Sequence, residues 1–141
     1  MTDTAACLTA AIARWNAGDL AGYLELYDPA IRLHGYAPAP LDRAAVEGFY
    51  RAVCAALPAP GRSAPHLDLH EVIATGDRLA ARFSMSGSHA ATFLGVPATG
   101  RPYVLSGITI LHFAGARVVE RWSSTDMLGL LVQLGALPPP G

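Results

Sequence analysis

The sequence predicts an α+β protein in which helices from the first half cover one face of a curved, mixed or antiparallel sheet built by the second half. Apolar residues recur at helical spacing as far as Leu57 and alternate with polar residues from Leu67 onward. Turns at Thr75-Gly76-Asp77 and Ala114-Gly115 divide the alternating part into long hairpins. Helices over one face of a curved sheet leave a cavity between the layers, where a small ligand would bind.

The composition limits the number of domains and the kinds of partner that the protein can have. With 141 residues, 52% of them hydrophobic and 15% charged, we expect one domain over residues 1–141 with a packed core. A net charge of −1 and scattered arginines argue against nucleic acid as a partner. All ten basic residues are arginine, which excludes lysine Schiff-base chemistry and is typical of a GC-rich bacterial genome. The sequence has no secretory signal and no apolar run of about 20 residues, so we expect a cytoplasmic protein without membrane contact.

The first elements follow from helical spacing and its interruptions. A helix is expected over Asp3 to Asn16, and Gly18-Asp19 interrupts it. Asp19 caps a short second helix that reaches Tyr27, and Asp28-Pro29 ends it. Ala30 to Gly35 is expected to form a strand.

Two more helices are predicted by their caps. Asp42 caps a third helix that runs to Leu57 with an apolar stripe on one side. A final helix is expected over Met127 to Leu134, because Gly135 and the prolines beyond it stop the pattern.

The strands of the second half are defined by alternation. In the segment from Leu79 to His89, one face carries Leu79, Ala81, Phe83, Met85, Gly87 and His89. A second hairpin is expected from Tyr103 to Phe113 and from Arg117 to Thr125. Apolar residues occupy both faces of its first strand, so we expect a homodimer formed through Val104, Ile108 and Ile110.

Several kinds of site lack support. The sequence has no glycine-rich phosphate loop, no G-x-S-x-G and no Cys-x-x-Cys. His66 and His70 look like a metal pair, but on a strand they lie about 13 Å apart, far beyond the reach of one ion. We therefore expect no metal and interpret this stretch as a solvated strand face.

The remaining histidines are weaker candidates. His34 and His112 lie on strands whose buried face the pattern does not fix, and a structural role is favoured for both. His89 ends a row of core-facing residues, so it points towards the mouth or floor of a cavity.

The strongest chemical signal is Glu120-x-Trp122-x-x-x-Asp126. On a regular strand these residues share one face, and Trp122 would partly desolvate Asp126 and make it a better base. Asp126 also stands where the last strand meets the last helix, which is the position of a helix N-cap. The pattern leaves base and cap as alternatives.

At these residues the chain resembles the SnoaL-like polyketide cyclases of the NTF2-like superfamily. The resemblance rests on Phe83 to Gly100, with its Gly-Ser-His step and Leu-Gly-Val-Pro-Ala-Thr-Gly loop, and on Ile110 to Gly135, with Glu-x-Trp, an aspartate and Gln-Leu-Gly. The N-terminal half matches loosely, through Trp15 to Asp19 and the helix after Asp42. Ala90-Ala91-Thr92 depart from the glycine often found there, which alters the expected pocket shape.

The resemblance implies a cone-shaped fold, often dimeric, and intramolecular aldol closure of an aromatic polyketide ester without metal or cofactor. It assigns the general base to Asp126 and a pocket histidine to His89. The enolate oxygen would be held by His89 or by a tyrosine hydroxyl of Tyr23, Tyr50 or Tyr103. The side chains expected to bind substrate are Trp122, Trp15, Tyr50, Phe83, Met85 and His34.

Other functions remain open beside the cyclase. The chain could be a non-catalytic dimeric module that binds a small apolar ligand, or an isomerase or epoxide-hydrolase-like enzyme on the same fold. Convergence of His89, Trp122 and Asp126 on one cavity would favour an enzyme. An outward-facing Asp126 would remove its base.

Overall fold

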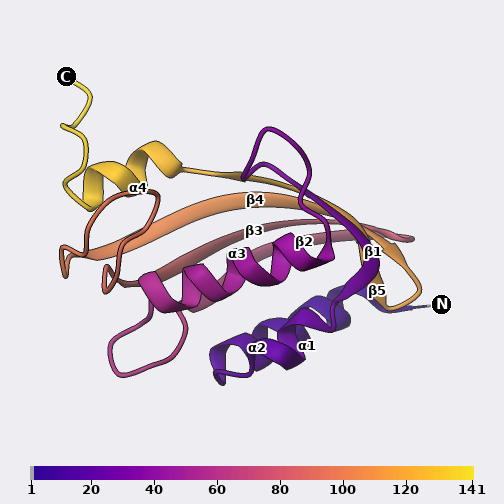
Figure 1. Cartoon of the computed structure of the whole chain (residues 1–141). Coiled ribbons are helices and arrows are strands. Elements are labelled where there is room, and N and C mark those ends of the chain that lie inside the picture. Colours follow the sequence, from indigo (N-terminus) through magenta and orange to yellow (C-terminus); the bar gives the residue numbers. More distant parts are fainter. Residues whose placement is uncertain (1) are drawn as a thin grey trace.

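A computed structural model describes residues 2–141 and contains one five-stranded sheet, strongly curved, with helices packed against one face (Figure 1). The strand order across the sheet is β1-β5-β4-β3-β2. The strands are β1 (Tyr27–His34), β2 (His66–Thr75), β3 (Arg78–Ser88), β4 (Pro102–Ala114) and β5 (Arg117–Thr125). The α+β class and the curved mixed sheet are confirmed.

The pairing follows the two predicted hairpins. β2 with β3, β3 with β4 and β4 with β5 are antiparallel neighbours. β1 returns to the far edge and pairs with β5 in parallel. The parallel pair makes the sheet mixed and brings the first half of the chain against its last strand.

Each helix begins at an aspartate cap. The helices are α1 (Thr4–Asn16), α2 (Leu20–Leu24), α3 (Arg43–Ala56) and α4 (Met127–Gln133). Their caps Asp3, Asp19, Asp42 and Asp126 each accept a hydrogen bond from a backbone N–H three residues ahead, at 2.8–3.0 Å. These bonds satisfy amides that have no partner inside the helix, which explains why the helix starts could be predicted.

The second helix is shorter than the spacing predicts. It ends at Leu24, and β1 already begins at Tyr27 rather than at Ala30. The backbone N–H of Val118 donates to Leu26 at 2.7 Å, so pairing with β5 overrides the local helical pattern. Asp28-Pro29 falls inside an edge strand, where a proline is tolerated.

Helices cover one face of the sheet and leave the other face exposed. The concave face meets α1 and α3 and carries the buried residues of β3 and β4, as the alternation predicts. The opposite face is left open and exposes Val104, Ile108, Ile110 and Trp122. No helix within residues 2–141 is long and apolar enough to cross a membrane.

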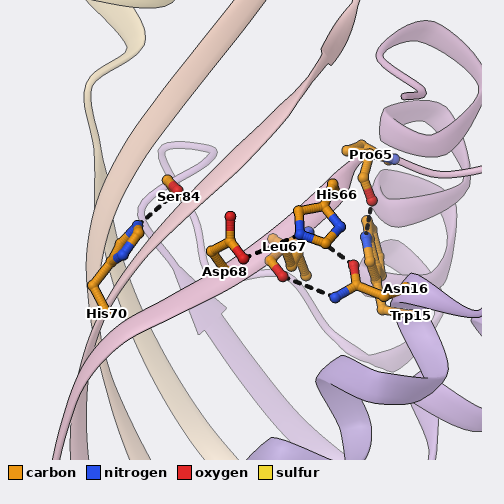
Figure 2. Close-up of polar contacts among 8 residues, drawn as sticks. All are labelled: Trp15, Asn16, Pro65, His66, Leu67, Asp68, His70 and Ser84. Carbon is orange, nitrogen blue, oxygen red and sulfur yellow. Dashed lines mark hydrogen bonds and ion pairs between the residues drawn. The ribbon is translucent and has the colours of Figure 1, made fainter. Parts of the chain in front are cut away.

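The end of α1 is fastened to the start of β2 (Figure 2). The indole Nε1 of Trp15 donates to the carbonyl of Pro65 at 2.8 Å. Asn16 exchanges two hydrogen bonds with the backbone of Leu67, both 2.8 Å long. These three bonds fix α1 at the sheet edge and hold the Trp15 ring over the concave face.

The histidine-rich stretch of β2 is occupied by surface contacts. His66 Nε2 lies 3.0 Å from an Asp68 oxygen, and His70 Nε2 lies 2.8 Å from the Ser84 hydroxyl on β3 (Figure 2). Within residues 2–141 no group of three or more His, Cys, Asp or Glu side chains is arranged to hold a metal ion.

Candidate functional site

An apolar cavity lies between the helices and the concave face of the sheet. Its empty space, including the part open to solvent at the mouth, is about 730 Å³. α1, α2, α3 and strands β2 to β5 all contribute to its wall. The predicted site residues that line it are Trp15, Tyr50, Phe83 and Met85.

Among residues 2–141, the charged side chain that lines this cavity is Arg121 of β5. It is only 7% exposed. Its Nε donates to Thr109 Oγ1 at 2.9 Å and to Ser123 Oγ at 3.0 Å. No carboxylate within residues 2–141 lies close enough to form an ion pair with it. The cavity therefore has one cationic end in an otherwise apolar wall.

Three tyrosine hydroxyls surround Nη1 of Arg121. Nη1 donates to Tyr50 at 2.9 Å, to Tyr23 at 3.2 Å and to Tyr27. The hydroxyl oxygens of Tyr23 and Tyr27 are 2.7 Å apart, and those of Tyr27 and Tyr50 are 3.2 Å apart. Trp15 packs edge-on against the rings of Tyr23 and Tyr50, with centroids 4.9 and 5.5 Å away. We call Arg121, Tyr23, Tyr27 and Tyr50 the Arg121–tyrosine cluster.

The cluster carries a positive charge at neutral pH. Burial raises the pKa of Tyr23 and of Tyr50 well above the ordinary phenol value, so both hydroxyls stay neutral. Burial alone lowers the pKa of Arg121, but the facing tyrosine oxygens outweigh it and the pKa lies above the ordinary value. Arginine stays protonated inside proteins.

A β-bulge explains why Arg121 was missed and why the predicted face of β5 is wrong. Val118 pairs with Phe113 and Glu120 pairs with His112, so Val119 is an extra residue. Alternation changes phase there: Val118 faces inward, and beyond the bulge the inward residues are Arg121 and Ser123. Periodicity alone cannot place such a bulge, and Arg121 therefore looked like an outer-face residue.

Trp122 and His34, expected to bind substrate, lie on the other face of the sheet. Trp122 is 37% exposed, and the His34 ring stacks on it with centroids 5.1 Å apart and 4° between the planes. His34 Nε2 lies 2.7 Å from an oxygen of Glu120, and His112 packs against Trp122 from the side. Neither Trp122 nor His34 lines the cavity.

His89 is fully buried but does not line the cavity either. Its Nδ1 accepts from the backbone N–H of Thr99 at 3.2 Å, so in the neutral ring the proton is on Nε2, which has no partner within residues 2–141. The backbone N–H of His89 donates a hydrogen bond to the carbonyl of Arg101, and its carbonyl accepts one from the N–H of Gly100. His89 therefore closes the loop between β3 and β4, which contributes Phe93 to the cavity wall.

Asp126 lies beside the cavity with its carboxylate outside. The side chain is exposed, and Oδ1 accepts from Gly129 N–H at 2.8 Å as the cap of α4. Its neighbours Thr125 and Met127 both line the cavity, so the backbone of Asp126 runs along the rim. The expected convergence of His89, Trp122 and Asp126 is not found.

A curved sheet roofed by helices around an apolar cavity with one polar end defines a small-ligand protein of the NTF2-like fold. A model of SnoaL-like polyketide cyclases matches residues 5–134, and the chain belongs to that family. No curated protein sequence matched the chain.

Solved structures agree in fold. AclR, a proposed hydroxylase from Streptomyces galilaeus, superposes with a TM-score of 0.84 at 28% identity, over 96% of this chain and 98% of that one. TsrD from Streptomyces laurentii gives 0.80 at 26% identity, over 94% and 95%. IdmH, a proposed polyketide cyclase from Streptomyces antibioticus, gives 0.73 at 28% identity, over 94% and 99%. The chain is similar in size and shape both to a proposed cyclase and to a proposed hydroxylase.

Proposed function

We propose that the protein binds a small, mainly apolar carbonyl compound in the cavity and promotes its intramolecular, aldol-type ring closure. The observation that carries this proposal is the cavity itself, whose wall is mainly apolar and has a polar end at Arg121 and Thr109. A wall of this kind folds an apolar chain back on itself, and such positioning lowers the barrier for joining its two ends. The reaction consists of proton transfers and the formation of one carbon–carbon bond, with no net oxidation or reduction, and it requires no cofactor.

The proposed chemistry has three steps. A base removes a proton from a carbon between two carbonyl groups, leaving an enolate. The enolate carbon forms a bond with a second carbonyl carbon of the same molecule, and the electron pair of that carbonyl moves to its oxygen. The resulting alkoxide takes up a proton to give the cyclic alcohol. Arg121 and the hydroxyl of Tyr50 would stabilise the negative oxygen at each stage.

Asp126 is the base in this proposal. It matches the family's base and lies between Thr125 and Met127, which line the rim. To reach substrate, its carboxylate must rotate away from Gly129 N–H, which gives up a cap bond worth about 1 kcal/mol. A general base contributes about 10²–10⁴-fold in rate, so that loss is small beside the gain.

A second candidate is a non-catalytic binding module of the same family. It is favoured by one observation, that Asp126 is exposed and occupied as a helix cap. In that function the cavity binds the ligand and Asp126 only begins α4.

A ring-closure assay separates the two candidates. The probe is the methyl ester of an aromatic 1,3-keto acid that also carries a ketone side chain, and the cyclic product is followed by chromatography. We expect Asp126→Asn to lower kcat by about 10²–10⁴-fold while substrate binding stays within about twofold. Arg32→Met, an exposed arginine on β1, is the control. Full turnover in Asp126→Asn would assign Asp126 to the cap alone, and no closure by the wild type would favour the binding module.

A further inference from the structure

The Arg121–tyrosine cluster has more hydrogen-bond donors than acceptors. Arg121 Nε and Nη1 are satisfied by hydroxyl oxygens, but Nη2 has no acceptor within residues 2–141. Nη2 is also partly accessible. Within residues 2–141, the side-chain polar atom that is both fully buried and without a partner is Nε2 of His89, not Nη2 of Arg121. Since Arg121 lines the cavity, the two N–H groups of Nη2 have access to it.

The tyrosines add a third unused donor. Three hydroxyl protons are available on Tyr23, Tyr27 and Tyr50, and the two contacts between their oxygens use two of them. The two N–H groups of Nη1 are shared among the three oxygens, and within residues 2–141 no further acceptor contacts these hydroxyls, so one of the three O–H groups has no acceptor in the cluster. Thr109 and Ser123 form no hydrogen bond with these tyrosine hydroxyls: Thr109 donates to the carbonyl of Trp122, and the Ser123 hydroxyl pairs with that of Thr109.

A buried cation without a counter-ion is costly to a fold. Moving a guanidinium out of water is repaid only by a partner anion or by a full set of acceptors, and residues 2–141 supply neither at Nη2. The rest of the wall is mainly apolar, so an anion that entered would be held with little competition from water. Nη2 therefore offers two N–H donors, at the polar end of the cavity, with which an anionic group of a ligand can pair.

We propose that the Arg121–tyrosine cluster is an anion-binding site and that the cavity ligand carries one acidic oxygen group, attached to a mainly apolar body, which pairs with Nη2 of Arg121. Two sources of this chemistry fit: a carboxylate, or the enolate of a strongly acidic 1,3-dicarbonyl. The inference deepens the proposed function and rests on it for the location of the ligand. It concerns binding and does not depend on turnover.

The test compares three aromatic probes of similar size at neutral pH by titration calorimetry. These are 1-naphthoate, its neutral amide 1-naphthamide, and 2-acetyl-1,3-indandione, which is an enolate at this pH. We expect at least one anion to bind the wild type roughly tenfold or more tightly than 1-naphthamide, because a charged hydrogen bond contributes that much. The anion that binds more tightly identifies the source.

Variants assign the preference to Arg121. Arg121→Met should abolish it while leaving 1-naphthamide binding within about threefold, and Arg121→Lys, which keeps a cation, should retain part of it. Arg32→Met should keep it in full. Equal binding of all three probes by the wild type, or an undiminished preference in folded Arg121→Met, would overturn the proposal. If the protein prefers anions but does not close the ring, only the proposed reaction is contradicted. If it closes the ring but does not prefer anions, only this inference is contradicted.

Discussion

At the residue scale, Asp126 is one of four aspartates that occupy the same structural position. Asp42 at α3 and Asp126 at α4 accept nearly identical hydrogen bonds, 3.0 and 2.8 Å long, and both side chains are exposed. This similarity gives a matched control: any property of Asp126 that Asp42 lacks must come from its place beside the cavity.

For Asp126 we expect a small effect on stability. Asp126→Ala should lower the free energy of unfolding by about 1 kcal/mol, because the cap bond is lost, and Asp126→Asn by only a few tenths, because asparagine caps about as well. Urea unfolding measures both, with Asp42→Ala and Asp42→Asn as the reference pair. A clear gain in stability for Asp126→Asn would mean instead that the carboxylate spends its time unpaired in the apolar cavity.

Buried tyrosines and one thiol make the fold sensitive to alkali. Burial raises the pKa of Cys54 from 9.0 to about 11, and burial also raises the pKa of Tyr103, Tyr23 and Tyr50 above the ordinary 10.0. When the pH rises above the ordinary pKa values of these groups, the unfolded chain releases protons that the folded chain still holds. The stability that is present below about pH 9 is therefore lost as the pH rises.

The measurement is the free energy of unfolding in urea between about pH 8 and pH 11. We expect a steady fall, and in Cys54→Ala the fall should begin about one pH unit later, where the phenols start to titrate. Unchanged or rising stability over this range would contradict the assignment of these groups as buried and protonated.

At the element scale, the helix starts and most strand faces were predictable because they depend on local chemistry. The aspartate caps, the turn at Gly76 and the alternation of β3 each act within a few residues. The site was only half predictable, since it depends on long-range pairing. The extra residue Val119 reverses the faces of β5, so Trp122 turns outward and Arg121 inward.

Substitutions at two glycines test the packing of β3 against the end of α3. A Cβ on Gly87 of β3 would lie 2.5 and 2.6 Å from the carbonyl oxygens of Leu57 and Pro58, at the end of α3. A Cβ on Gly48, exposed inside α3, would meet nothing within 4 Å. We expect Gly87→Ala to lower the free energy of unfolding by about 1–3 kcal/mol and Gly48→Ala to raise it by about 0.5–1 kcal/mol. Thermal or urea unfolding checks both, and equal effects would contradict the packing described for β3 and α3.

At the scale of the whole molecule, the sheet separates two apolar surfaces. The concave face encloses the cavity, and the outer face exposes Val104, Ile108 and Ile110 of β4 and Trp122 of β5, which pairs with Ile110. An open apolar sheet face of this kind favours association of two copies.

We therefore expect a homodimer formed through the outer face. Ile108, 57% exposed at the centre of that surface, is the residue to change. Ile108→Glu should give a monomer, because the dimer would have to bury the new charge in its interface. The monomer should stay folded, because position 108 lies outside the core. Light scattering measures the mass, with Ile73→Glu on β2 as the control. A monomeric wild type at working concentration would contradict the expectation.

The central claim is that ligand binds on the concave face, at the Arg121 end of the cavity, and not around Trp122 on the outer face. Methyl NMR of isotope-labelled isoleucine and methionine during a titration with 1-naphthoate tests it directly, because the labels divide between the faces. Ile12, Met85 and Met127 line the cavity, whereas Ile108 and Ile110 lie outside. We predict saturable shifts for the first three and none for the last two. Shifts confined to Ile108 and Ile110 would contradict the account.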